Sequence, residues 1–198
     1  MTSGILSIEA LITWVKEEDP DGSALAGTSP SGKALGKKTR ELTKNIEAGR
    51  GFYLWGSYDE RGFWKNIYLG KAGYGKYAGL QKRITEELRD ERCFLWIGVL
   101  SEMEILDKGA VLFPAKWSQY CKEWKNRHFK KAGTSHIIWV ATPAIDDSHV
   151  LNVEADLIET LNPIANVLRP TPPSELQAHT KEVIGHFRNQ IHGNRPPL

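Results

Sequence analysis

The feature that most constrains the fold is a pair of apolar runs, Phe52–Trp55 and Ile67–Leu69, rich in aromatic and branched residues. A polar segment that contains glycine separates them, so the pattern predicts two paired strands with a long hairpin connection over residues 57–66. Two tyrosines, Tyr53 and Tyr68, fall within the predicted strands. A tyrosine packs its ring while its hydroxyl stays available for hydrogen bonds, so we expect a site built on this sheet.

The composition indicates one domain with appendages, since 40% of the 198 residues are hydrophobic and a core of useful size can form. The two cysteines, Cys93 and Cys121, form no CxxC pair, so we expect reduced thiols rather than a disulfide framework. No apolar run approaches the length of about 18 residues that a membrane span needs. The N-terminus lacks the layout of a signal peptide, so we expect a cytoplasmic protein with no membrane partner.

The remaining elements follow from apolar spacing and from helix start and stop signals. Helices are predicted over residues 7–17, 39–48, 79 to about 92, 115–131, 148–161 and from 174 onward. A strand is predicted at His136–Ala141, whereas residues 18–32 have the composition of a loop. The run Cys93–Leu100 is apolar throughout and suits either a strand or the buried end of a helix.

This order of elements predicts the α+β class, with a small mixed sheet flanked by helices. The core reads β-β-α, then a basic insertion, then β-α. We expect three regions, which are a helical arm with a basic segment at 1–50, a core at 51–168 with its insertion at 101–135, and a linker and helix at 169–198.

Two segments carry an excess of positive charge. Residues 33–50 hold six basic and two acidic side chains, and residues 108–131 hold seven and one. Such faces suit phosphate contacts, although a merely solvated basic face is the alternative. The candidate nucleic-acid-binding residues are Lys37, Lys38, Arg40, Lys116, Lys122, Lys125, Arg127, Lys130 and Lys131.

Two charged residues stand out on apolar helix faces. Glu154 shares its spacing with Val150 and Leu157 and so faces the core, whereas Asp156 and Glu159 point elsewhere. A carboxylate on an apolar face needs a compensating cation, which is either a metal ion or the partner in a structural salt bridge.

In the helix after the hairpin, Arg83 and Glu87 form an i, i+4 pair beside an apolar stripe. The pair is either an exposed ion pair of little energetic weight or a sign that Arg83 points into the same cleft as Glu154.

Taken together, these residues resemble the GIY-YIG nuclease family. The family's motif elements match, in order, Gly51-Phe52-Tyr53, Tyr68-Leu69-Gly70 with Lys71, Arg83, and the closing set Glu154, Leu157, Ile158, Pro163 and Asn166. The ordered set is specific, although each short motif alone means little. The chain is most similar to the incision domain of the excision-repair nuclease and to small restriction enzymes of this family, which also carry lysine after the second motif.

The resemblance implies a Mg²⁺-dependent DNA endonuclease in which Mn²⁺ substitutes for Mg²⁺. It implies Glu154 as the sole protein ligand of the metal, Arg83 as the group that holds the scissile phosphate, and Asn166 as a support of the motif. With Glu87, which stands where the family pattern differs, the expected catalytic set is Tyr53, Tyr68, Lys71, Arg83, Glu87, Glu154 and Asn166.

One position departs from the family pattern. Members often carry histidine or tyrosine four residues after the helix arginine, where this chain has Glu87. The general base therefore stays open among Tyr53, Tyr68 and Glu87. We expect a restriction-type or mobile-element nuclease, with a homodimer if the target is palindromic. The alternatives are a structure-selective repair nuclease and a non-catalytic nucleic-acid-binding module with a degenerate site.

Overall fold

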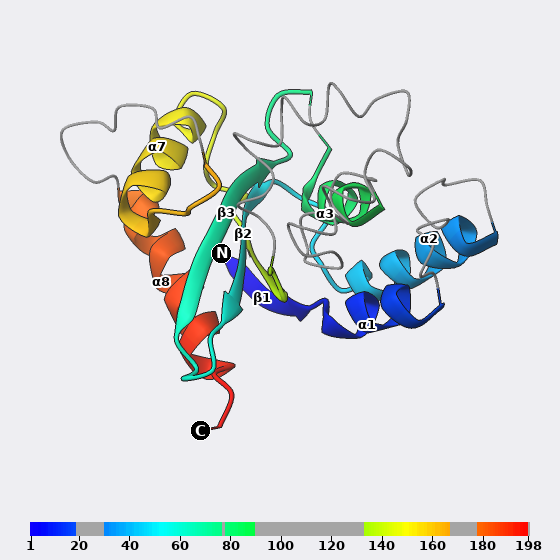
Figure 1. Ribbon diagram of the computed structural model, residues 1–198. Helices are drawn as coiled ribbons and strands as arrows, with labels where there is room; N and C mark the ends of the chain where they lie inside the picture. Colours follow the sequence, from blue (N-terminus) through cyan, green and yellow to red (C-terminus); the bar gives the residue numbers. More distant parts are fainter. Residues whose placement is uncertain (19–29, 77, 90–132, 167–177, 198) are drawn as a thin grey trace, which may run out of the picture.

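The computed structural model describes residues 1–18, 30–76, 78–89, 133–166 and 178–197 of the chain (Figure 1). Its strands are β1 (Thr2–Ser7), β2 (Gly51–Tyr58), β3 (Trp64–Ala72) and β4 (His136–Ala141). They form one sheet in the order β1-β4-β2-β3, and every neighbouring pair is antiparallel. The α+β class is confirmed, but the prediction of a mixed sheet is wrong for these strands.

Strand β1 was not predicted. It pairs with β4 along its whole length, from Thr2 opposite Ala141 to Ser7 opposite His136. Its six residues mix small, polar and apolar side chains, so neither a helical nor a clear alternating pattern marks it. A Cβ atom on Gly4 would lie 2.8 Å from the ring of Trp139, so this small residue lets the two strands approach. The predicted N-terminal arm therefore contributes a strand to the central sheet.

The hairpin is confirmed, but its strands are longer and its connection shorter than predicted. The strands continue to residue 58 and resume at residue 64, with a register shift between Trp55 and Gly56. Asp59 Oδ1 accepts the backbone N–H groups of Arg61 and Phe63 at 2.9 and 2.8 Å, which is how an aspartate stabilises a tight turn.

Helices cover both faces of the sheet (Figure 1). On one face lie α1 (Glu9–Glu18), α2 (Pro30–Thr43) and α3 (Leu80–Arg89), and on the other α7 (Val150–Leu161) and α8 (Ala178–Gly193). Helix α2 begins nine residues before the predicted 39–48, at a proline, which is well tolerated in a first turn. The predicted helix 115–131, the run 93–100 and nearly all of the insertion 101–135 lie outside the described residues.

Alternation along the hairpin divides the side chains between two cores. Tyr53 and Trp55 pack with α1, α2 and α3, whereas Phe52 and Leu54 pack with α7 and α8. Lys71 lies opposite Phe52 in the register and therefore on the α7 face. Neighbouring residues of β3 thus serve opposite faces of the sheet.

The Asp156 side chain is buried, although its spacing in α7 does not place it on the same face as Val150 and Leu157. Its Oδ2 accepts a hydrogen bond of 3.0 Å from the hydroxyl of Thr180 on α8. Helix α8 covers this face of α7, which the spacing of α7 alone does not reveal. None of the described helices combines the length and the apolar composition that crossing a membrane requires.

Candidate active site

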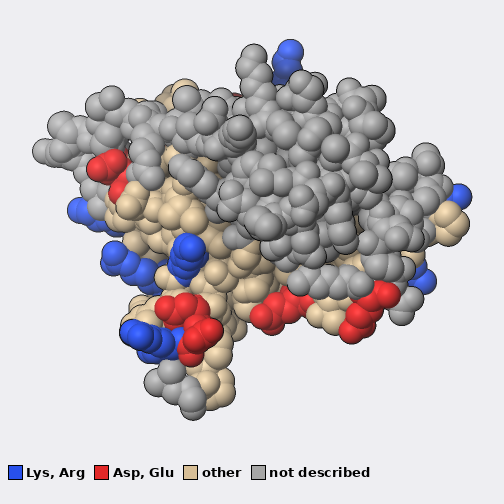
Figure 2. Space-filling model, in the orientation of Figure 1, with Lys and Arg blue, Asp and Glu red and all other residues tan. Residues whose placement is uncertain are grey.

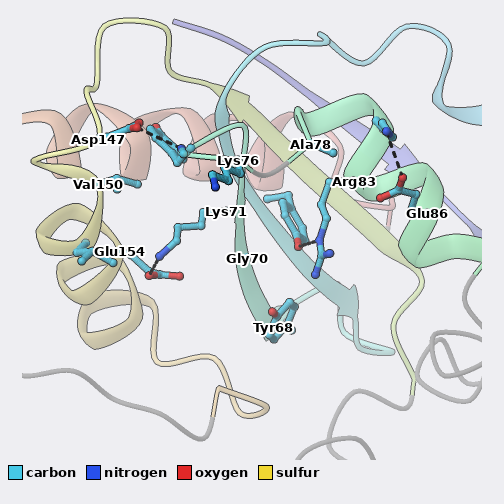
Figure 3. Close-up of a pocket in the computed structure, with 15 residues that line it drawn as sticks. Tyr68, Gly70, Lys71, Lys76, Ala78, Arg83, Glu86, Asp147, Val150 and Glu154 are labelled. Atoms are coloured by element: carbon cyan, nitrogen blue, oxygen red, sulfur yellow. Dashed lines mark hydrogen bonds and ion pairs between the residues drawn. The ribbon is translucent and has the colours of Figure 1, made fainter.

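A cleft of about 800 Å³ lies along β3, between the first turns of α3 and α7 (Figure 3). We call it the β3 cleft. Its lining residues are Tyr53, Tyr68, Gly70, Lys71, Tyr74, Gly75, Lys76, Ala78, Lys82, Arg83, Glu86, Asp147, Val150, Leu151 and Glu154. Five of the seven predicted catalytic side chains therefore line one cavity, although they come from β2, β3, α3 and α7.

The α7 side of the cleft carries an ion pair between Lys71 Nζ and Glu154 Oε2. Each side chain is about one fifth exposed, at 22% and 21%. Figure 3 shows Lys71 reaching from β3 toward α7, while the other carboxylate oxygen of Glu154 faces the middle of the cleft. Glu154 is thus directed into the β3 cleft, and the lysine supplies the cation that its position demands.

The α3 side carries a hydrogen-bonded cluster of Tyr53, Glu87 and Arg83. The Tyr53 hydroxyl donates to Glu87 Oε1 at 2.6 Å, and Arg83 Nε lies 2.9 Å from the same oxygen. The Tyr53 residue is 1% exposed and the Glu87 side chain 8%, whereas the Arg83 side chain is 43% exposed. The guanidinium therefore links a buried carboxylate to the open cleft.

Gly70 provides the space for this cluster. It lies opposite Tyr53 in the register, and a Cβ atom at Gly70 would lie 2.3 Å from Cζ and 2.4 Å from the hydroxyl oxygen of Tyr53. No side chain other than hydrogen fits beside the phenol as it is placed. The last residue of the Tyr68-Leu69-Gly70 motif thus has a physical role in seating the tyrosine of the first motif.

The surroundings of Tyr53 keep its proton in place. Burial, with the nearby Glu87 carboxylate as the next contribution, raises the pKa of the Tyr53 phenol well above its ordinary value. Burial acts to lower the pKa of Arg83, but Glu87 and Tyr53 outweigh it and the net pKa is raised. At neutral pH the cluster therefore contains a neutral phenol at Tyr53 and a permanent cation at Arg83.

Tyr68 lines the β3 cleft, whereas Asn166 lies outside its lining. The half-buried ring of Tyr68 lines the cleft, 6.4 Å from the ring of Tyr53 between centroids. Asn166 does not line the cleft. Its Oδ1 accepts the Leu69 N–H at 2.8 Å and its Nδ2 donates to the Leu69 carbonyl at 2.9 Å. Asn166 therefore fixes the strand that carries Tyr68 and Lys71.

Lys76 and Lys82 also line the cleft, although neither is among the predicted site residues. With Lys71 and Arg83 they give the lining four basic side chains against three acidic ones. Lys76 lies five residues after Lys71, and Lys82 directly precedes Arg83. This closeness to the motif residues was the sequence signal that could have identified both lysines. The predicted basic residues come instead from the two densest positive runs, 33–50 and 108–131.

The predicted nucleic-acid-binding residues of α2 do not reach this cleft. Lys37, Lys38 and Arg40 are exposed, and Lys38 Nζ lies 5.0 Å from the ring centroid of Trp14. The other predicted basic residues, from Lys116 to Lys131, lie outside the described residues. On the face in Figure 2, the described basic side chains stand in small groups among acidic ones.

Among the described residues, no three histidine, cysteine, aspartate or glutamate side chains gather as a metal-binding group. A magnesium site built on one carboxylate needs no such group, because Mg²⁺ keeps several waters and accepts substrate phosphate oxygens.

Comparisons of the chain with protein-family models, with curated proteins and with solved structures found no significant match.

Proposed function

We propose that this protein is a Mg²⁺-dependent DNA endonuclease of the GIY-YIG type, as its motif set implies. The observation that carries the proposal is the β3 cleft, where Tyr53, Tyr68, Lys71, Arg83 and Glu154 come together from four separate elements. Residues that lie up to 101 positions apart in the chain share one cavity, and each is of a type that phosphodiester hydrolysis uses.

Glu154 suits a magnesium ion. Its side chain is partly exposed, and one oxygen faces the cleft while the other contacts Lys71. A single carboxylate with room for water and phosphate is the kind of donor set that Mg²⁺ accepts in nucleases. When bound, the ion would neutralise charge on the scissile phosphate and stabilise the departing oxygen.

The protein's own side chains would bind and orient the substrate. Arg83 presents its planar guanidinium to the cleft and would hold a phosphate by two hydrogen bonds. Lys71 would leave Glu154 for a phosphate oxygen when substrate enters. Lys76 and Lys82, at the edge of the same cleft, are placed to contact neighbouring phosphates of the strand.

The test is cleavage of supercoiled plasmid in Mg²⁺ by the wild type, by Glu154→Gln and by Glu159→Gln. Glu159 is an exposed carboxylate on the same helix and so provides the matched control. We expect cleavage by the wild type and the control, and a loss of about 10²- to 10³-fold in Glu154→Gln, comparable with removal of one electrostatic stabiliser. Equal rates in all three proteins would refute the assignment of Glu154.

The ion pair on α7 favours a second candidate, which is a nucleic-acid-binding module without turnover. Lys71 occupies one oxygen of the only carboxylate proposed to hold the metal. This candidate predicts DNA binding that weakens steeply with salt, and no cleavage in Mg²⁺, Mn²⁺ or Ca²⁺. If cleavage occurs, mapping the cut ends on a long DNA separates a restriction-type enzyme from a structure-selective one.

A further inference from the structure

The buried carboxylate of Glu87 is the feature that the proposed function does not use. It lies beneath Tyr53 rather than in the lining of the β3 cleft. Its Oε1 accepts from the Tyr53 hydroxyl at 2.6 Å and lies 2.9 Å from Arg83 Nε. Its Oε2 is buried and makes no hydrogen bond with any described residue. Buried carboxylate oxygens without a donor are uncommon in folded proteins.

The geometry orders the three groups from the cleft inward. Tyr53 is 1% exposed, and it contributes to the lining of the cleft. Its hydroxyl oxygen has two acceptor sites; Arg83 Nε lies 3.5 Å from this oxygen, and a water in the cleft would use the remaining site. Its own hydrogen already points at Glu87, in a bond short enough for transfer. A phenol alone is a poor base at neutral pH because its ordinary pKa is about 10. A phenol that passes its proton on never has to hold a negative charge.

We propose that Glu87 receives, through the Tyr53 hydroxyl, the proton lost by the attacking water. This inference rests on the endonuclease function proposed above. The water oxygen bonds to phosphorus while the bond to the leaving oxygen breaks. One proton moves from water to the Tyr53 oxygen as the Tyr53 proton moves to Glu87 Oε1, and the leaving oxygen takes a proton from solvent. Glu87 ends the step neutral and returns its proton by the same path.

Glu87 does not touch the water itself, so it is a positioning residue for Tyr53. The relay explains why a carboxylate suits this position in the chain. It assigns the proton transfer to Tyr53, whose hydroxyl donates to the Glu87 carboxylate. Arg83 stays charged and holds the carboxylate in line at 2.9 Å while its exposed end binds phosphate.

The charged and titratable groups around Glu87 come from each element packed against α3. Glu87 contacts Tyr53 from β2 and Arg83 from α3 itself, and Tyr68 from β3 interacts electrostatically with these two residues. Helix α2 meets α3 through the hydroxyls of Thr43 and Thr85 at 2.6 Å, and its described charged side chains are exposed. The proposed relay predicts that replacing Glu87 alters the acid limb of the pH–rate profile.

The test compares pH–rate profiles of plasmid cleavage for the wild type, Glu87→Gln and Glu87→His. Glutamine keeps the shape and the acceptor oxygen but cannot take a proton. We expect Glu87→Gln to bind DNA as the wild type does, to cleave about 10²- to 10⁴-fold more slowly at neutral pH, and to lose the acid limb. Histidine can accept a proton, so Glu87→His should regain activity with an acid limb near the ordinary imidazole pKa of about 6.5.

The outcomes separate the relay from the function on which it rests. Wild-type rate and profile in Glu87→Gln, with Glu154→Gln inactive, would overturn the relay and leave the endonuclease standing. A wild type that cleaves no DNA would overturn both. Thermal unfolding of each variant checks folding, and Glu182→Gln, an exposed carboxylate on α8, should match the wild type throughout. Slow cleavage with an unchanged acid limb would assign Glu87 a structural role only.

Discussion

The two sides of the β3 cleft are built in opposite ways. On the α3 side, Tyr53 and Glu87 are almost completely buried and joined by a short hydrogen bond. On the α7 side, Lys71 and Glu154 are each about one fifth exposed and joined by an ion pair at the cleft surface. One strand serves both sides, because alternate residues of β3 face opposite ways.

This difference divides the candidate site into two halves. We call Tyr53 and Glu87 on the α3 side the fixed half, and Lys71 and Glu154 on the α7 side the exchangeable half. Packing around a buried tyrosine fixes its rotamer, so the α3 side would be preorganised for the proposed reaction. A partly exposed ion pair contributes little to stability and exchanges partners readily with water, metal or phosphate. The contrast predicts that substitutions on the α3 side damage both folding and cleavage, whereas those on the α7 side act mainly on ligands.

The largest effect should come from Gly70→Ala, which breaks the fixed half. The new methyl group would lie 2.3 Å from Tyr53 Cζ, so the ring must move and the bond to Glu87 must lengthen. We expect a loss of about 1–3 kcal/mol in the free energy of unfolding, measured with urea. The control is Gly185→Ala in α8, where nothing lies within 4 Å and alanine should stabilise by about 0.5–1 kcal/mol. Equal stability of the two variants would contradict the assigned packing.

Asn166→Ala tests the strand shared by both halves. It removes two hydrogen bonds to the Leu69 backbone, so the free energy of unfolding should fall by about 1–3 kcal/mol. Asn152→Ala, at an exposed position of α7, is the control and should change stability little. A fall in cleavage that parallels the fall in stability would agree with a supporting role. Lost cleavage at full stability would place Asn166 in contact with substrate.

The raised pKa of Tyr53 predicts how stability depends on alkaline pH. The unfolded chain releases this proton near pH 10, but the folded protein retains it. The stabilisation is complete below that pH and is lost as pH rises toward the folded pKa, with a slope of up to about 1.4 kcal/mol per pH unit. Tyr53→Phe should flatten the slope between pH 10 and 11.5 in urea unfolding. Tyr58→Phe, whose parent phenol is less buried, should flatten it less.

The smallest effect on stability should come from Lys71→Met on the exchangeable half. Loss of a partly exposed ion pair should cost about 1 kcal/mol or less. Because Lys71 competes for the Glu154 carboxylate, its removal should raise the affinity of the DNA-free protein for Mn²⁺ in calorimetric titration. Glu154→Gln should lower that affinity. A lower affinity in both variants would show that the lysine supports the metal site rather than competes for it.

The sequence predicted the elements whose apolar spacing is regular. The strand His136–Ala141 and the helix ending at Leu161 form close to the expected bounds, and the hairpin forms with longer strands than expected. The motif order also indicated which side chains would meet, since five of them line one cleft. Their chemical roles stay predictions.

Tertiary contacts decided what the sequence could not. The strand Thr2–Ser7 is defined by its partner β4 rather than by its own pattern. Asp156 is buried because α8 packs over it, and no spacing within α7 reveals that cover. The hydrogen bond from Tyr53 to Glu87 could not be predicted, because the sequence does not reveal that α3 packs on the Tyr53 face of the sheet. Local periodicity assigns a face to a residue but does not say what covers that face.

The two hydrogen bonds of Asn166 also bear on how the sheet ends. Strand β3 is one of the two outermost strands of the sheet that the described residues form, and an outermost strand with unpaired backbone groups invites pairing with another chain. Here the Asn166 amide takes both backbone groups of Leu69, and the backbone N–H groups of Ile164 and Ala165 take the carbonyls of Asn66 and Ile67. A strand from a second copy cannot continue the sheet past these residues. The segment that closes the motif thus also guards this edge against aggregation.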